Sequence, residues 1–251
     1  MVDSEKITMV PKASLAAEII SQAESYDGIR AGMVRLEEVL KGHSYQYNPE
    51  GPAIMTQVED GQVVDWPTKA QTVLVLGLYH SEKDPWLDWW ERGDTGGNRH
   101  LREISELLKQ WLKEKYHLNA YPLPYDVEKG GIFLKDAAVL SGIGIIGRSN
   151  LFLHPDWGPR IRLRSILLEA ELPTTNAPDG FNPCKTCDEF CQKACPMKAF
   201  PKGKYHRPLC RVQLITDVEN KVPDGEIGEK GNRNWVIKYC RACELSCPVG
   251  A

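Results

Sequence analysis

Residues 184 to 248 carry the pattern Cys184-x2-Cys187-x3-Cys191-x3-Cys195-Pro196, then a single Cys210, then Cys240-x2-Cys243-x3-Cys247-Pro248. All 8 cysteines of the 251-residue chain lie in this stretch. A four-iron cube binds one thiolate at each corner, and a short Cys-x2-Cys turn presents two of the four. The pattern therefore predicts two [4Fe–4S] clusters and leaves no cysteine for another role.

The Cys-Pro endings are typical of bacterial two-cluster ferredoxins, in which the last cysteine of a run binds the other cluster. The first run departs from the ferredoxin spacing, because three residues instead of two separate Cys187 from Cys191. Two neighbouring clusters form an electron relay. The crossing rule assigns one cluster to Cys184, Cys187, Cys191 and Cys247, and the other to Cys195, Cys210, Cys240 and Cys243.

Zinc and disulfide bonds are the alternatives to iron. Two four-cysteine zinc sites would use the same thiolates, but the repeated x3-Cys-Pro endings are not a zinc-ribbon pattern. Disulfides require an oxidising compartment, and the start MVDSEKITMVPKAS shows neither a secretory nor a twin-arginine export signal. The expected location is therefore the cytoplasm.

The composition is that of an ordinary globular protein, with 42% hydrophobic and 26% charged residues. The formal net charge is −3 and the pI is about 6.1, which argues against a large nonspecific nucleic-acid surface and leaves a local basic patch open. No apolar run is long enough to span a bilayer, so no membrane association is expected.

Hydrophobic periodicity predicts an α/β fold before the cysteines. The run Thr72–Tyr79 is continuously apolar and predicts a central buried strand. The alternation in 160–168 predicts a second strand, with Arg160, Arg162 and Arg164 on one face that is solvated by default. A short strand is expected between residues 51 and 67. Helices are expected over residues 14–25, 33–41, 99–116 and 134–140.

Two further segments are open to a functional interpretation. Trp86, Trp89 and Trp90 have helical spacing in a long connection, which favours a short helix packed on the core over a lid for a flat ligand. Gly142, Gly144 and Gly147 match G-x-G-x-x-G, yet a helical pattern precedes them where a dinucleotide site needs a strand. We interpret these glycines as a tight loop that permits close backbone approach, with an NAD or flavin site as the alternative.

The stretch 134–172, LKDAAVLSGIGIIGRSNLFLHPDWGPRIRLRSILLEAEL, followed by the cysteine pattern, resembles the epoxyqueuosine reductases and the corrinoid reductive dehalogenases. The family has Gly-x-Gly-x-x-Gly-Lys/Arg, a polar pair with Asn, and a His/Ser-Pro-x-x-Gly turn. Its four-one-three order of cysteines also matches. The resemblance covers about residues 70–251. Its matching residues are Gly142, Gly144, Gly147, Arg148, Ser149, Asn150, His154, Pro155 and Gly158.

The resemblance implies a nitroreductase-related α/β sandwich that binds cobalamin, over residues 1–175, and a ferredoxin-like module with two [4Fe–4S] clusters, over residues 176–251. It implies a reductase in which electrons from an external ferredoxin or flavodoxin pass through the clusters to the cobalt. The Gly-rich loop would lie against the corrin. Side chains implied to bind the cofactor are Arg148, Ser149, Asn150 and His154, beside the glycines at 142, 144, 147 and 158.

Two departures from the family leave the substrate open. Epoxyqueuosine reductases carry an Asp-Ser-Ala-Pro segment whose Asp resembles a proton donor, whereas this chain has Tyr125-Asp126-Val-Glu-Lys-Gly-Gly. Asp126 is the expected donor, and Tyr125 and Lys135 are the alternatives. The helical-repeat tail that helps those enzymes hold tRNA is missing after Ala251, so a small molecule or a corrinoid protein is a better candidate substrate than tRNA.

Two functions compete on these observations. The first is a cobalamin-dependent reductase that the two clusters supply with electrons. The second is an electron-transfer protein that reduces a corrinoid, or another redox centre, on a partner protein and binds no cobalamin itself. A zinc-stabilised binding module is a third hypothesis. The first predicts a cleft beside the Gly-rich loop, and the second predicts a cluster near an exposed face.

Overall fold

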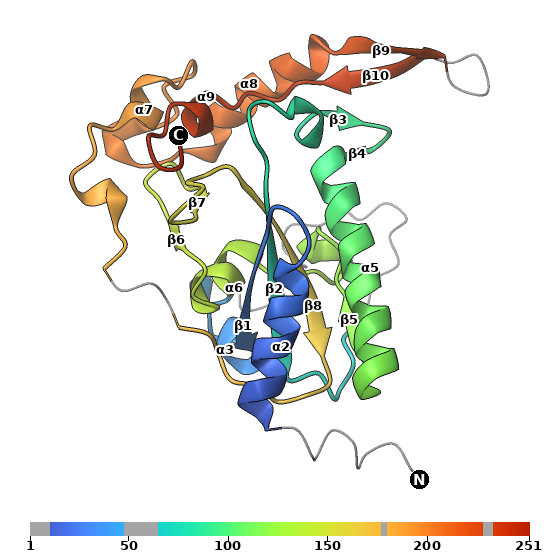
Figure 1. Cartoon of the computed structure of the whole chain (residues 1–251). Coiled ribbons are helices and arrows are strands. Elements are labelled where there is room, and N and C mark those ends of the chain that lie inside the picture. Colours follow the sequence, from blue (N-terminus) through green and yellow to red (C-terminus); the bar gives the residue numbers. More distant parts are fainter. Residues whose placement is uncertain (1–10, 48–64, 177–179, 228–232) are drawn as a thin grey trace. The chain divides into compact units, whose positions relative to one another are not determined.

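The structure is a computed structural model that describes residues 11–47, 65–176, 180–227 and 233–251 (Figure 1). The chain divides into two compact units, each assembled from separate stretches of sequence. The sheet unit comprises residues 1–78, 101–144 and 163–179, and the cysteine unit comprises 79–100, 145–162 and 180–251. The predicted boundary between residues 175 and 176 divides the chain once, whereas these units interleave, and it stays a prediction.

A four-stranded sheet with the order β1-β2-β8-β5 forms the centre of the sheet unit. β1 pairs antiparallel with β2, and β5 pairs antiparallel with β8. The hydrogen bonds Gln71 N to Leu168 O and His80 N to Arg160 O show that β2 and β8 also run in opposite directions. The strand bounds are β1 (Ile29–Arg35), β2 (Thr72–Tyr79), β5 (Ala120–Pro122) and β8 (Ile161–Leu168).

The central position predicted for the run TVLVLGLY is confirmed, since β2 is buried along its length and has a neighbour on each side. Three predicted helices are also confirmed: α2 (Lys12–Glu24), α5 (Gly96–Tyr116) and α6 (Leu134–Leu140). α2 packs along β1 through Leu15 and Ile19 (Figure 1). The apolar stripe of α5 is buried as well, so the core of this unit forms from ordinary amphipathic elements.

The helix predicted over 33–41 is wrong in its first half. Strand β1 continues to Arg35, and the helix α3 (Leu36–Leu40) follows directly, with a further short helix, α4 (His43–Tyr47), after Gly42. Met33 and Val34 are fully buried and lie opposite Leu74 and Val73 of β2. Pairing along the whole of β2 therefore outweighs the weak helical preference of this segment. The short strand expected between residues 51 and 67 falls mostly outside the described residues.

The single helix predicted for the three tryptophans is also wrong. A short 3-10 turn, η2 (Pro85–Leu87), contains Trp86, and Trp90 begins strand β3 (Trp90–Glu91). Leu87 and Asp88 are buried while Trp86 is 50% exposed, so the chain turns its carboxylate inward and its aromatic ring outward. Asp88 is buried because it forms ion pairs with Arg162 and Arg241.

The cysteine unit contains short elements. One sheet has the order β4-β3-β10-β9, and β6 pairs with β7 in a separate hairpin. No helix in the described part of the chain is long and apolar enough to cross a membrane. The remaining bounds are β4 (Asp94–Thr95), β6 (Ile145–Ile146), β7 (Phe152–Leu153), β9 (Val222–Ile227), β10 (Arg233–Ile237), η4 (Pro183–Lys185), α7 (Phe190–Lys193), η5 (Pro201–Gly203), α8 (Arg207–Glu219) and α9 (Ala242–Leu245).

Candidate functional site

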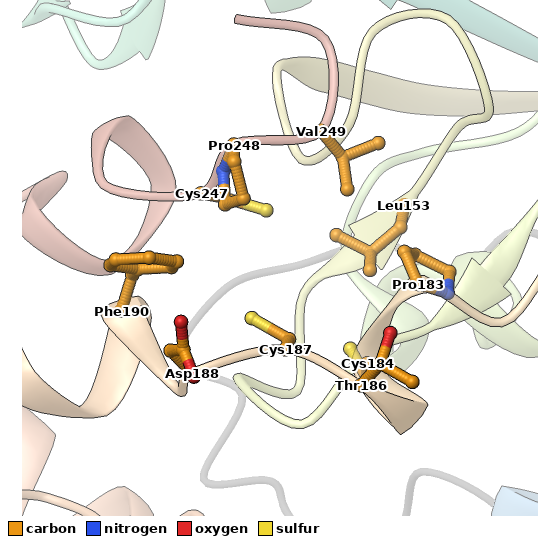
Figure 2. A pocket seen from close by; sticks show the side chains of 10 residues that line it. All are labelled: Leu153, Pro183, Cys184, Thr186, Cys187, Asp188, Phe190, Cys247, Pro248 and Val249. Carbon is orange, nitrogen blue, oxygen red and sulfur yellow. The ribbon is translucent and has the colours of Figure 1, made fainter.

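A cavity of about 310 Å³ in the cysteine unit is lined by three of the predicted iron ligands, Cys184, Cys187 and Cys247. Figure 2 shows the sulfur atoms of Cys187 and Cys247 pointing into the space from opposite sides. Most of the remaining wall is apolar, formed by Leu153, Pro183, Phe190, Pro248 and Val249, and the polar residues Thr186 and Asp188 complete it. The cavity therefore joins residues far apart in sequence into one site with a thiol-rich, largely apolar lining.

The fourth predicted ligand of this group, Cys191, lies within electrostatic reach of the other three. Burial raises the pKa of the Cys191 thiol, and the charges of Cys184, Cys187 and Cys247 raise it further. Burial also raises the pKa of Cys247, to which Cys184 and Cys187 again add, while Arg160 lowers it. The crossing rule had placed these four cysteines together.

The other four cysteines gather in the same way. Burial raises the pKa of Cys240, with further contributions from Cys195 and Cys210. Burial raises the pKa of Cys243 to about 12, and Cys240 and Cys210 contribute to it. The amide N–H of Ala199 lies 3.3 Å from the sulfur of Cys195. The Tyr205 hydroxyl is hydrogen-bonded to Cys210, and burial followed by this bond raises the pKa of Tyr205.

All eight thiols are free and partly buried. Among the residues that the structure describes, no three His, Cys, Asp or Glu side chains converge as one metal ion requires. One zinc ion holds four sulfurs at ~2.3 Å each, whereas a four-iron cube takes a thiolate at each of its separate corners.

The turn that follows β6 brings the Gly-rich segment against this cavity. A Cβ atom at Gly147 would lie 2.6 Å from Leu153 Cδ1 and 3.3 Å from Cys184 Sγ, so a larger residue would have to displace the Leu153 side chain. The amide N–H of Arg148 lies 3.5 Å from the same sulfur, and the Arg148 guanidinium pairs with Glu189 at 2.7 Å. The close approach predicted for this loop therefore has an identified target at Gly147, namely the wall around Cys184.

The other two glycines of the motif lie in the sheet unit, directly after α6. Gly142 has a φ of 77°, which favours glycine. Because a helix precedes the motif and the short strand β6 follows, the strand-then-helix context of a dinucleotide site is absent from this described segment. The decision against an NAD site rests on this context and stays a prediction.

The segment 154–158, HPDWG, forms a tight turn closed by two hydrogen bonds between His154 and Gly158. The buried His154 ring stacks on Trp157 at 4.6 Å, and its Nδ1 accepts a hydrogen bond from the Asp156 amide. Gly158 has a φ of 56°, and a Cβ there would lie 1.9 Å from the Val249 carbonyl oxygen. This turn therefore packs against the chain just after Cys247, which explains its glycine without a cofactor.

The expectation that the arginines of 160–168 form a solvated face is wrong. Arg160 is 6% exposed and Arg164 is 7% exposed. Arg160 donates hydrogen bonds to the carbonyls of Val249 (3.1 Å) and Leu245 (3.4 Å), on either side of Cys247. Its buried charge is compensated by these oxygens, and the arginine holds the last cysteine run in place.

A buried charged cluster, which the sequence patterns did not indicate, supports the second thiol group. Asp88 forms ion pairs with Arg162 at 2.7 Å and with Arg241 at 2.5 Å. His80 Nδ1 lies 3.0 Å from Asp88, and Arg241 also pairs with Glu244. Since Arg241 lies between Cys240 and Cys243, the cluster fixes the segment that bears these thiols. The one sign of this cluster in the sequence is Asp88, a charged residue directly after Leu87 in an otherwise apolar pattern.

Two carboxylates and one guanidinium face the His80 ring. Asp88 and Glu244 lie 3.0 and 3.6 Å from Nδ1, and Nη2 of Arg241 lies 3.0 Å from the same nitrogen. Burial by itself raises the pKa of Asp88. The hydrogen bond from His80, with the charges of His80, Arg162 and Arg241, outweighs burial and brings this pKa below its ordinary value.

The three candidate proton donors all lie in the sheet unit. Tyr125 is 51% exposed. Asp126 is partly exposed and pairs with Lys129 at 3.0 Å, and Gly131 packs against its backbone. Lys135 lies in the first turn of α6, next to the buried Asp136, which accepts hydrogen bonds from Ser44. A proton-donating carboxylic acid needs a dry environment, which the partly exposed Asp126 lacks in this structure, and the donor assignment stays a prediction.

Solved structures share this fold. Epoxyqueuosine reductase with an epoxyqueuosine-modified tRNA-Tyr stem loop is 19% identical, with a TM-score of 0.64 over 94% of this chain and 65% of that chain. Epoxyqueuosine reductase from Bacillus subtilis is 18% identical, with a TM-score of 0.62 over 94% and 65%. A reductive dehalogenase described for B12-dependent dehalogenation is 13% identical, with a TM-score of 0.65 over 97% and 33%.

These likenesses confirm the predicted resemblance at the level of the fold. The chain spans 65% of the length of the epoxyqueuosine reductases and 33% of the dehalogenase. No protein-family model matches the sequence, and no curated protein does either.

Proposed function

We propose that this protein is an iron–sulfur oxidoreductase whose cysteine unit binds two [4Fe–4S] clusters. The observation that carries the proposal is the gathering of eight free, partly buried thiols in one unit, where Cys184, Cys187 and Cys247 line one cavity. The crossing rule would divide them into two groups of four. The shared fold with epoxyqueuosine reductases and reductive dehalogenases supports the same conclusion.

The chain's own residues fit the first cluster. Cys184, Cys187, Cys191 and Cys247 would bind it, in a cavity with an apolar wall. The amide of Arg148 and the guanidinium of Arg160 place positive character near these sulfurs. Hydrogen bonds and positive charge at cluster sulfurs raise the reduction potential, because they stabilise the added electron.

The chain also fits a second cluster, bound by Cys195, Cys210, Cys240 and Cys243. Here the Ala199 amide and the Tyr205 hydroxyl contact the sulfurs, and Asp217 accepts a hydrogen bond from the Cys240 amide at 2.7 Å. Burial disfavours the free thiolate at Cys243, so iron binding there must displace a proton and will be pH-dependent.

Cobalamin is the proposed second cofactor, on the strength of the shared fold. When bound, its cobalt supplies the low-potential reducing chemistry that protein side chains lack. Two exposed polar side chains on the turn at 147–151, those of Arg148 and Asn150, match the amide-rich edge of a corrin. Ser149 and His154 are buried, and they would support the turn that carries Arg148 and Asn150. Gly147 and Gly158 are accounted for by packing, so we assign them no direct contact.

The proposed proton donor is Asp126, with Tyr125 and Lys135 as alternatives. A small molecule or a corrinoid-bearing protein is the proposed substrate. Because one similar structure is an epoxyqueuosine reductase with a tRNA stem loop, RNA is a second candidate substrate. Experiment must distinguish it from a small molecule or a corrinoid-bearing protein.

The test uses the full chain purified without oxygen and titrated with hydroxocobalamin. We expect the visible spectrum of base-off corrin and retention of the cofactor on gel filtration. If the Asn150→Ala variant no longer retains the corrin while the spectrum of its clusters is unchanged, the turn at 147–151 is part of the corrin site. If the clusters are present and no corrin is retained, the chain is an electron-transfer protein and the reductase proposal fails.

A further inference from the structure

The surface around the second thiol group is basic in a chain that is acidic overall. Every charged residue between Glu189 and Asp217 is Lys or Arg, although the formal net charge of the chain is −3. Five of them surround Cys195 and Cys210, and all five side chains are exposed. We call these residues the basic surface: Lys198, Lys202, Lys204, Arg207 and Arg211.

A compact loop holds the lysines together. The hydrogen bond from His206 N to Ala199 O (2.8 Å) closes the loop, and bonds from Gly203 N to Phe200 O and from Lys204 N to Pro201 O tighten it. Lys198 and Lys202 have φ values of 48° and 54°, in the left-handed region that residues with a side chain rarely adopt. Such backbone persists where the surrounding structure fixes it, and it is concentrated at functional sites.

The arginines continue this surface on the first turns of α8. Arg207 and Arg211 are four residues apart and so lie on one face of the helix, with Cys210 between them in sequence. None of the five cations forms an ion pair with a carboxylate among the described residues. Next to them on α8, Val212 is 46% exposed and Ile215 is 50% exposed. Unpaired positive charge beside exposed apolar side chains is the composition of a protein-docking surface.

RNA is the other polyanion that a basic surface attracts, and the aromatic residues argue against it. Single-stranded RNA is bound by stacking its bases on exposed aromatic side chains. The aromatic residues of this loop, Phe200 and Tyr205, pack against each other at 5.8 Å, and Phe200 is 9% exposed. Of the ring side chains in this loop, that of His206 is in the exposed class. The exposed aliphatic side chains of α8 therefore favour a protein partner over RNA.

We propose that the basic surface docks an acidic electron-transfer protein of the ferredoxin or flavodoxin class next to Cys195 and Cys210. This inference rests on the proposed iron–sulfur function and adds to it the place where the electron donor binds. Charge complementarity steers such encounters and accelerates them about 10- to 1,000-fold at low salt.

The experiment measures binding of an oxidised, acidic [2Fe–2S] ferredoxin to the cluster-loaded full chain by calorimetry at low salt. The test variant is Lys202→Glu/Lys204→Glu/Arg207→Glu. The matched control, Lys69→Glu/Lys83→Glu/Lys113→Glu, reverses three exposed lysines elsewhere and changes the net charge equally. A third variant, Lys202→Arg/Lys204→Arg/Arg207→Lys, keeps the charge.

We expect the test variant to bind ferredoxin at least about tenfold more weakly than the wild type, while the control and the charge-conserving variant bind normally. The difference should shrink at 1 M salt, where the screening length falls to about 3 Å. Equal binding by the test and control variants would overturn the proposal. So would a test variant that keeps ferredoxin binding and loses affinity for a tRNA stem loop, since that would make the surface an RNA site.

Iron analysis separates this failure from failure of the proposed function. If the preparations contain no iron, the proposed function fails before docking is measured. If all variants contain iron that dithionite reduces, and ferredoxin binding does not depend on the basic surface, only the docking proposal fails.

Discussion

Two helices of equal length show how differently the two units are held together. α2 and α8 each have 13 residues. α2 buries Leu15, Ala16, Ile19 and Ala23, whereas α8 buries no residue and exposes Val212, Ile215 and Val218. A helix in water gains most of its stability from packing an apolar face, so α8 must be held by something other than apolar burial.

The short helices α7 and α9 share this property, as neither buries a residue. Around them lie eight free thiols, the ion pairs of Asp88 and the hydrogen bonds of Arg160. Units with so small an apolar core usually depend on a metal for folding free energy. The sheet unit is stabilised by its core. On the proposed iron–sulfur function, the cysteine unit would be stabilised by the clusters that it binds, together with its buried charges.

Removal of iron should therefore have the largest effect on stability. It should destabilise the cysteine unit and leave the sheet unit unchanged. Chelation should lower hydrogen-exchange protection of the α8 amides at least about ten-thousandfold, or ~5.5 kcal/mol, because metal binding and folding are coupled. The β2 and β8 amides should keep their protection. Mass spectrometry of exchanged peptides makes the measurement. Equal protection of the α8 amides with and without iron would contradict the proposal that the cysteine unit depends on iron for its stability.

Asp88→Asn should have the next largest effect. It leaves the half-buried Arg162 without this carboxylate and Arg241 with Glu244 alone, and the loss of such a pair costs up to about 3–5 kcal/mol. Asp84→Asn is the control, an exposed carboxylate in the same segment that should change stability by less than about 0.5 kcal/mol. Equilibrium denaturation compares them. Equal stability of the two variants would show that the charged cluster does not stabilise this unit.

The stability difference between wild type and Asp88→Asn should also depend on pH. The pKa of Asp88 is lowered in the folded chain, so its stabilisation is fully present above the unfolded value of about 3.9 and is lost as the pH falls through the folded pKa. The stability difference between wild type and Asp88→Asn should hold from pH 7 to about pH 4 and shrink below it. A difference that vanished already at pH 6 would contradict the assignment of this stabilisation to Asp88.

Gly158→Ala should have a smaller effect, and Gly93→Ala is its matched control. Both glycines have positive φ, 56° and 80°, so both variants incur the left-handed cost of about 1–2 kcal/mol. Only at Gly158 would the added Cβ meet a backbone oxygen, that of Val249, whereas Gly93 faces open space. We expect an extra loss of about 1–3 kcal/mol at Gly158 by thermal denaturation. Equal losses would contradict the packing role assigned to the turn at 154–158.

Asp126→Asn should have the smallest effect on stability, since its only described ionic partner is the exposed Lys129. The melting temperature should stay unchanged while substrate turnover falls, if Asp126 donates the proton. Lys129→Met is the control that breaks the same ion pair and keeps the carboxylate. Equal turnover in both variants would move the donor assignment to Tyr125 or Lys135.

The sheet unit was largely predictable because its signals are local. The apolar run of β2 and the stripe of α5 specify buried faces within one element. The segment 33–41 misled the prediction because its strand half is set by pairing with β2, a contact distant in sequence. Propensity is a weak guide wherever tertiary pairing decides.

In the cysteine unit the sequence indicated the thiols and not the residues that support them. The spacing of the thiols predicts their chemistry, and the division into two groups of four stays a prediction. The burial of Asp88 and Arg160 did not follow from the sequence, since a polar residue is expected at the surface until its distant partner is known. The basic surface was visible in sequence as an uninterrupted run of positive charge, but its place beside Cys195 and Cys210 required the fold.

Iron and acid-labile sulfide analysis of the chain, purified and reconstituted without oxygen, tests the central claim most directly. The account predicts about eight irons and about eight sulfides per chain, falling by about half when Cys247→Ser or Cys240→Ser disables one site. Two zinc ions per chain with no sulfide would contradict it.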